Sequence, residues 1–190
     1  MKSKICAITI LLMPLWLQMP VKALNQAHLE QLRQTGSCVG CDLSSAQLPE
    51  ALLSNTDLRG ANLTGANLIR ADLRRANLTG ANLAGASLIN ANLVGANLSS
   101  SNLKVASLIR ANLRRANLAG AELNLAKLPS ANLTGADLRQ ADLSAADLSS
   151  ANLSSADLTG TNLRNADLDN AILKNAKLTR AVMPDGTLSP

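Results

Sequence analysis

A five-residue repeat runs through most of this chain and limits what it can fold into. Read in fives, residues 41–190 form 30 pentads without an insertion. The third position is Leu in 29 pentads, the first is Ala in 25, and the second is Asn or Asp in 20. The repeated motif is A-(N/D)-L-x-x, as in residues 61–65. One packing arrangement must therefore recur many times along the chain.

This period fits neither a helix nor a long strand. Each residue of an α-helix turns by about 100°, so a five-residue step overshoots one turn by roughly 140° and scatters the Leu side chains. In a strand, side chains alternate between faces, so a five-residue step reverses the face at each repeat. The period instead predicts a short extended segment and a corner in every pentad.

The last two positions of the pentad carry the predicted corner. Every Gly between residues 56 and 180 occupies the fifth position, and Pro49, Pro129 and Pro184 occupy the fourth. A type II turn takes Pro at its first central residue and Gly at its second, because the second has a positive φ. The residue types thus predict a type II turn at the corners.

This array resembles the pentapeptide-repeat proteins over residues 41–190. The resemblance implies an all-β solenoid, a right-handed quadrilateral β-helix with four pentads per coil. It also implies that the third-position Leu and first-position Ala point inward, and no charged residue occupies these two positions. About seven coils then form a rod roughly 35 Å long, because neighbouring strands lie about 4.8 Å apart.

The first 23 residues have the pattern of a cleaved signal peptide. Lys2 and Lys4 precede an apolar run, and residues 21–23, Val-Lys-Ala, fit a small-residue cleavage site. The run is short for a membrane span of about 20 residues, so we expect no span after cleavage. We therefore expect export, and the resemblance of residues 38–44 to secreted cyanobacterial pentapeptide-repeat proteins implies a periplasm or thylakoid lumen. Removing three of the 18 Lys+Arg leaves 15 against 13 Asp+Glu, a net charge of +2.

Residues 24–40 are expected to close the N-terminal end of the rod. Asn25 is a helix N-cap candidate, Leu29 and Leu32 share one helical face, and Gly36 can end the helix. At the other end, Ile172 and Val182 replace the outward Asn or Asp. They indicate either a homodimer contact through the C-terminal coil or a looser last coil.

A CxxC motif, Cys38 and Cys41, lies just before the array. In an exported protein it predicts a structural disulfide, with free thiols, a redox motif or half of a metal site as alternatives. A four-Cys zinc site needs a second pair, and His28 alone does not complete one. The run of residues 38–44 also resembles the N-terminal motif of secreted cyanobacterial pentapeptide-repeat proteins.

The residue types give little support to an enzymatic function. The predicted mature chain has one His, and a Leu-filled rod offers no cleft for a catalytic triad or paired carboxylates. The Asn/Asp column is better explained by hydrogen bonds of these side chains to nearby backbone. We therefore expect no catalysis, no cofactor and no metal.

Six arginines form a candidate anion-binding site. The segment 68–75, LIRADLRR, returns forty residues later as 108–115, LIRANLRR. Forty residues are two coils of the expected fold, so the two sets should lie about 10 Å apart along one face. The alternative is a solubilising corner left by a duplication. The six candidates are Arg70, Arg74, Arg75, Arg110, Arg114 and Arg115.

The prediction for function is a non-catalytic extracytoplasmic scaffold that binds another protein. Anion binding by the arginines is the alternative. A more remote one is mimicry of DNA to inhibit topoisomerases, as in some proteins of the family that this chain resembles. Mimicry needs a strongly negative cytoplasmic rod, whereas this chain is slightly positive after cleavage and has an export signal. We expect no binding to nucleic acid.

Overall fold

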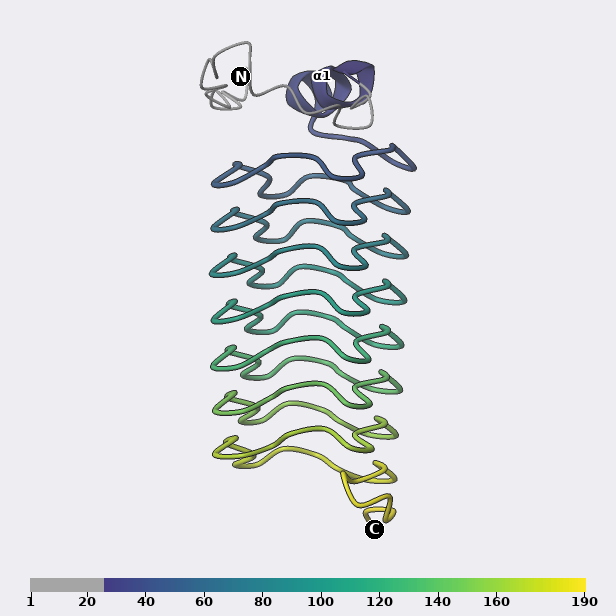
Figure 1. Cartoon of the computed structure of the whole chain (residues 1–190), viewed down its shortest axis with the longest axis vertical. Helices are drawn as coiled ribbons and strands as arrows, with labels where there is room; N and C mark the ends of the chain where they lie inside the picture. The colour runs from purple at the N-terminus through teal and green to yellow at the C-terminus, as the bar shows by residue number, and fades with distance from the viewer. Residues whose placement is uncertain (1–25) are drawn as a thin grey trace.

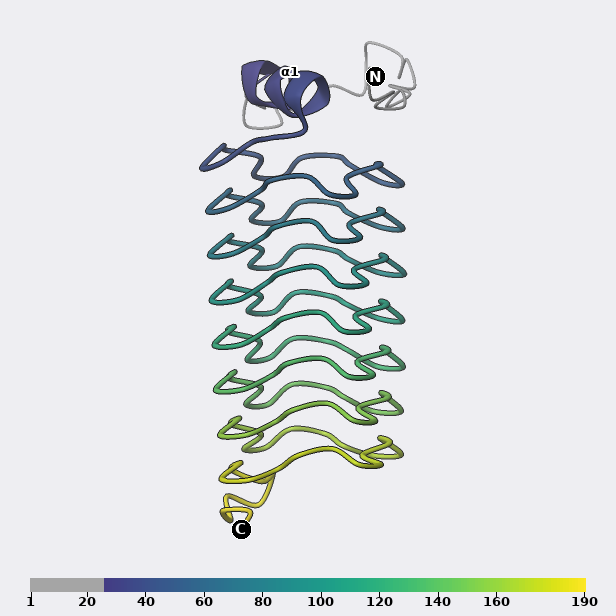
Figure 2. The ribbon, with the colours of Figure 1, turned by 180° about the vertical axis from the view of Figure 1, so that it is seen from behind.

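The computed structural model describes residues 26–190, which form a rod with a helix at its N-terminal end (Figure 1). Helix α1, Gln26–Thr35, is the only helix in this range. The predicted signal peptide and the N-cap candidate Asn25 lie outside the described residues. Seen from behind, the coils continue as one stack from α1 to the C-terminus (Figure 2).

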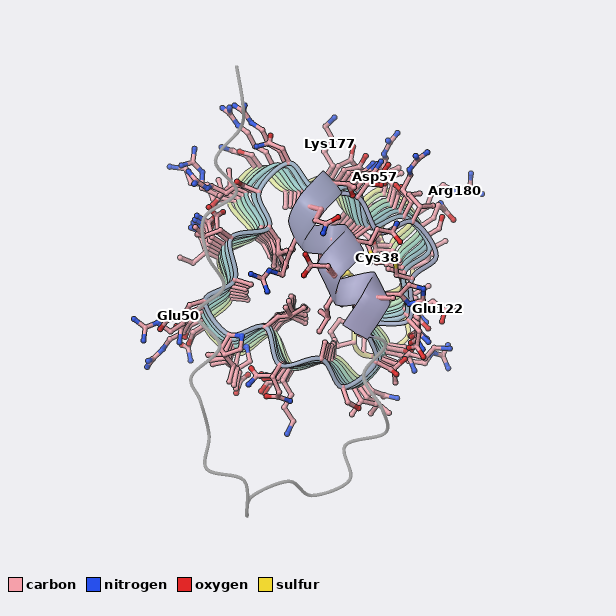
Figure 3. All side chains as sticks on the ribbon, turned by 90° about the horizontal axis from the view of Figure 1, so that it is seen from above. Cys38, Glu50, Asp57, Glu122, Lys177 and Arg180 are labelled. Carbon is pink, nitrogen blue, oxygen red and sulfur yellow. A yellow bond between two sulfur atoms is a disulfide. The ribbon has the colours of Figure 1, made fainter. Side chains whose placement is uncertain are left out.

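The coils are joined by parallel bridges between residues twenty apart in the sequence. The first joins Ser37 to Asp57 and the last of this register joins Asn162 to Val182. Each pentad contributes a single bridging residue, so residues 26–190 contain isolated bridges and no longer strand. Four pentads therefore make one coil, and the outline seen from above is four-sided (Figure 3). The expected four-sided β-helix is confirmed.

The corners have the predicted turn geometry. In the first complete turn of the array, the Ala46 N–H donates to the Leu43 carbonyl at 3.1 Å, and Ser45 between them has φ 58°. One left-handed residue at the second central position, with this hydrogen bond, is typical of a type II turn. The same φ sign recurs at the fifth position of later pentads, and Gly there avoids the strain of a side chain.

The Asn/Asp column stabilises these corners, as predicted. The Oδ1 atom of Asn62 accepts a hydrogen bond from the Thr64 backbone N–H at 3.2 Å. Asp72 and Asn112 do the same for the residues two positions ahead of them. This contact satisfies a backbone donor that the turn leaves without a partner.

The interior of the rod is filled by the Leu and Ala columns. Leu63 and Leu113 have no exposed surface, and the Ala residues beside them are equally buried. Where a hydroxyl replaces Ala, it bonds the backbone: Ser101 Oγ donates to the Leu98 carbonyl at 2.7 Å. The expectation that these two columns point inward is confirmed for the regular coils.

The ladder begins one pentad before the predicted boundary at residue 41. The Cys38 N–H donates to the Asp57 carbonyl at 2.7 Å, and Gly40 has φ 66°. Residues 36–40 thus form a pentad with buried Cys38 in the Leu position and Cys41 in the next Ala position. The repeat pattern hid this pentad because Gly36 and Cys38 replace Ala and Leu. Cys suits the site because it behaves as a small apolar side chain.

Helix α1 covers the N-terminal end of the interior. Leu32 is 2 % exposed and half-buried Leu29 packs beside it on the core. The helix ends at Thr35, and Gly36 after it has φ 67° and an N–H that donates to the Leu32 carbonyl at 3.0 Å. The predicted helix and its function as a lid on the first coil agree with this packing.

The last pentad departs from the repeat. The Met183 N–H donates to the Thr187 carbonyl at 2.7 Å, and Val182 forms an antiparallel bridge with Leu188. The chain therefore reverses, and Leu188 is 66 % exposed instead of pointing inward as the array predicted. Residues 187–189 thus pair with residues 180–183 and not with the coil before them.

Candidate functional site

The six arginines lie at the two corners that flank one side of the rod. Arg70 and Arg110 occupy the same corner two coils apart, and the other four occupy the corner that follows along the chain. Two coils separate the two sets by about 10 Å. We call this surface the arginine face: the six arginines and the outward residues 72, 92 and 112 between them. The intervening coil carries Asn90, Val94 and Gly95 at the corners.

Within the first set, two arginines bind carboxylates of this chain. Arg74 forms a two-pronged pair with Asp72, Nε to Oδ1 at 2.8 Å and Nη2 to Oδ2 at 2.6 Å. This hydrogen bonding holds the pKa of Asp72 below its usual value, against a smaller raising effect of burial. Arg70 Nη1 lies 3.2 Å from Oε1 of Glu50, one coil nearer the N-terminus. Both charges are thus partly neutralised.

The second set has no such partners. Asn112 occupies the position that Asp72 has two coils earlier. Asn90 lies one coil nearer the N-terminus than Arg110, as Glu50 does relative to Arg70. Among residues 26–190, Arg110, Arg114 and Arg115 form no ion pair, nor does Arg75 in the first set. The four guanidinium groups leave strong hydrogen-bond donors on one side of the rod.

An apolar column borders the arginine face, and the sequence reasoning missed it. Ile69, Ile89 and Ile109 stand in successive coils, each half-buried and each just before the fifth-position corner residue. We call these three residues the isoleucine ridge. The sequence shows this ridge when the fourth residues of pentads twenty residues apart are compared. Pro49 and Pro129 continue the column at either end.

A hollow lies at the corner of the first arginine set. Its volume is about 380 Å³, and five residues of three successive coils line it: Ser54, Asn55, Arg74, Arg75 and Val94. Arg75, which forms no ion pair among residues 26–190, is one of its lining residues, so the hollow adjoins the arginine face.

The Cys pair lies beneath α1. Cys38 and Cys41 are joined by a disulfide, and Cys38 Sγ lies 3.2 Å from the carbonyl oxygen of His28. The His28 Nδ1 atom accepts a hydrogen bond from the Asp42 backbone N–H at 3.1 Å. From above, Cys38 lies under the helix (Figure 3). This cluster connects the lid to the first coil.

Between residues 26 and 190, no helix is long and apolar enough to cross a membrane. Over the same range, no group of three or more His, Cys, Asp or Glu side chains is placed to hold a metal ion.

The fold and its repeated surface define a class of protein, and comparisons name it. The family model for pentapeptide repeats matches residues 37–75, 66–104, 106–144 and 146–183. The chain therefore belongs to the pentapeptide-repeat family, whose solved members similar to this chain are right-handed β-helices. A search of curated proteins found no match.

Several solved structures are similar to this chain. HetL, a pentapeptide repeat protein involved in heterocyst differentiation regulation in the cyanobacterium Nostoc, is 39 % identical over 80 % of this chain and 81 % of its own, with a TM-score of 0.40. A pentapeptide repeat protein of the cyanobacterium Cyanothece is 28 % identical over 80 % and 93 %, with a TM-score of 0.42. One from the Arabidopsis thaliana thylakoid lumen is 29 % identical over 60 % and 66 %, with a TM-score of 0.31.

Proposed function

We propose that this chain is an exported, non-catalytic scaffold that binds another protein with its outer surface. The observation that carries the proposal is the filled interior. Between Leu43 and Leu163, the Leu and Ala side chains of the two inward columns are at most 4 % exposed. An interior packed in this way has no room for a substrate, so recognition falls to the outward positions that the ladder holds in fixed register.

Two observations support export to a periplasm or thylakoid lumen. Residues 1–23 have the charged, apolar and small-residue pattern of a signal peptide. The Cys38–Cys41 disulfide is of a kind that persists in oxidising compartments.

We also propose that two copies pair through their C-terminal ends. Among the described residues, the backbone N–H groups of Leu168, Leu173 and Leu178 have no hydrogen-bond partner, and these side chains are only half-buried. Ile172 beside them is 50 % exposed. An open sheet edge with apolar side chains favours pairing with another edge. Because α1 covers the other end, tail-to-tail pairing closes at two copies and head-to-tail growth is blocked.

Photo-crosslinking tests the scaffold function. A crosslinking amino acid is placed on each side of one coil in turn, at Asn82, Ser87, Asn92 and Asn97, and the cells are irradiated. All four are outward second-position residues of similar exposure, so each controls for the others. We expect a discrete adduct with a protein from at least one side. Absence of an adduct from all four sides contradicts the proposal.

A further inference from the structure

We infer that the arginine face is the binding face of the scaffold and that its partner is an acidic protein segment. Carboxylates of this segment bind Arg110, Arg114 and Arg115, and its aliphatic side chains contact the isoleucine ridge. The inference rests on the proposed function, since it assigns a surface and a partner chemistry to the scaffold.

The two copies of the arginine motif supply the first step, because one carries its own carboxylates and the other does not. In the first copy, Asp72 binds Arg74 with two hydrogen bonds and Glu50 lies 3.2 Å from Arg70. The backbone register of the second copy is the same, two coils further on. The pair of Arg74 and Asp72 therefore shows, in this molecule, that a carboxylate fits an arginine of this motif.

The second copy presents the same guanidinium groups with those carboxylates replaced by amides. Asn112 uses its Oδ1 for the Arg114 backbone N–H at 3.3 Å, and its Nδ2 donates to no acceptor among residues 26–190. The donors of Arg114 and Asn112 are thus both available. Guanidinium groups prefer the two-pronged geometry of a carboxylate, so a carboxylate from another molecule matches this site.

Charge elsewhere on the rod does not neutralise the arginine face. Acidic residues are concentrated in residues 116–170, but the same side of these coils carries Asn132 and Asn152. Glu50, which pairs with Arg70, marks the arginine face in the view from above. Glu122 lies on the opposite side of the rod (Figure 3). The unpaired arginines of the second copy therefore give its surface a positive electrostatic potential, which attracts acidic segments.

The isoleucine ridge distinguishes a protein segment from other anions. Ile109 adjoins Arg110 in one turn, so apolar and cationic contacts lie side by side. Binding of single-stranded nucleic acid relies on aromatic stacking, and membrane interfaces on Trp and Tyr. This chain has no Phe or Tyr, and its single Trp precedes residue 24. An acidic segment with aliphatic residues uses both parts of the surface.

A reciprocal pair of substitutions tests the inference. Asn112→Asp should recreate the internal ion pair of Asp72 and Arg74, and Asp72→Asn should free Arg74. The probe is a fluorescein-labelled peptide of repeated Glu-Glu-Ile units, and its anisotropy is measured with the disulfide-bonded chain at low salt. We expect N112D to weaken binding by about tenfold, D72N to strengthen it, and R110Q/R114Q/R115Q to abolish it. Added salt should weaken it, because exposed charges are screened beyond about 10 Å at 0.1 M.

Matched controls separate the site from general charge. Asn102→Asp adds the same charge on the opposite side, and Arg139→Gln removes an arginine that pairs with Asp137 elsewhere. Neither should change binding by more than about twofold. Equal losses in N112D and N102D overturn the inference, as does no binding of the wild type. If a Glu-Glu-Ser peptide binds equally well, the isoleucine ridge is not part of the binding surface. Tighter binding to heparin or phosphatidylserine vesicles overturns the conclusion that the partner is a protein segment.

The crosslinking experiment distinguishes failure of this inference from failure of the scaffold function. Asn92 lies on the arginine face between the two arginine sets, and the other three positions lie on other sides. An adduct from Asn92 that N112D reduces supports both proposals. An adduct only from Asn82 or Asn97 keeps the scaffold function and overturns the arginine face as its binding surface. Ser87 adjoins Ile89 of the isoleucine ridge, so an adduct from Ser87 supports the arginine face only if N112D reduces it.

Discussion

The Nδ1 atom of His28 in α1 accepts a hydrogen bond from the backbone N–H of Asp42 in the first coil at 3.1 Å. The contact spans fourteen residues and fixes the lid to the rod beside the disulfide. An uncovered β-helix end exposes apolar side chains and unpaired backbone groups, which promote association. The lid therefore makes the two ends of this rod unlike each other.

Truncation of Leu32 should loosen this lid. Leu32→Ala removes a side chain that is 2 % exposed and should cost about 2–3 kcal/mol of unfolding free energy. Arg33→Ala, on the exposed side of the same helix, should have little effect. Hydrogen exchange of the α1 amides together with urea melts measures both. Unchanged exchange in the Leu32 variant contradicts the packing of α1 on the core.

Substitutions of an inward residue and of its outward neighbour should differ sharply in their effect on stability. Leu113→Asp places a charge without a partner in the filled interior and should cost several kcal/mol. Arg114→Asp changes an exposed corner and should cost under about 0.5 kcal/mol. Thermal melts of the two variants are the measurement. Equal losses would refute the inward and outward assignment.

The exported protein should begin at Leu24 and contain the Cys38–Cys41 disulfide. Removal of Trp16 with the signal peptide leaves no aromatic residue, so absorbance near 280 nm should be very low. Intact mass of the native protein before and after reduction decides both points. A full-length N-terminus with two free thiols is the contrary result.

Acid should remove the contribution of Asp72 to stability. Its folded-state pKa lies below the usual 3.8 because Arg74 binds the carboxylate, so the stabilisation is present above this range and lost as the pH falls through the folded-state pKa. Asp72→Asn should therefore be less stable than the wild type at pH 7, and the difference should shrink at a pH below 3.8. Asn can keep the hydrogen bond to the Arg74 N–H, as Asn112 does for Arg114. Urea melts at both pH values test the ion pair alone, and a constant difference would disprove the linkage.

A charge at the open end should prevent pairing of two copies. Ile172→Asp places a carboxylate at a position that is 50 % exposed and lies beside the unpaired N–H groups of the last coil. We expect the wild type to be a dimer and this variant a monomer by light scattering, with similar melting curves at low protein concentration. Asn92→Asp, far from both ends, is the control. A monomeric wild type refutes tail-to-tail pairing.

The repeat alone predicted the corners, because each pentad is a local rule, and the family resemblance implied the two inward columns. A left-handed residue favours Gly, a turn beside it favours Asn or Asp, and a narrow interior favours Leu with Ala. Leu63, Gly65 and Asn62 illustrate all three, and each takes its predicted place. The four-sided outline came from the family resemblance, and the ladder between residues twenty apart agrees with it.

Tertiary structure decided what no single pentad encodes. Cys38 joined the ladder because its coil stacks on the next one, and Leu188 left it because the chain reverses after Met183 and pairs Leu188 with Val182. The difference between Arg70 and Arg110 likewise depends on the residue one coil away, which is Glu50 for Arg70 and Asn90 for Arg110. Such contacts join residues that only the stacking of coils brings together, so they depend on the whole rod.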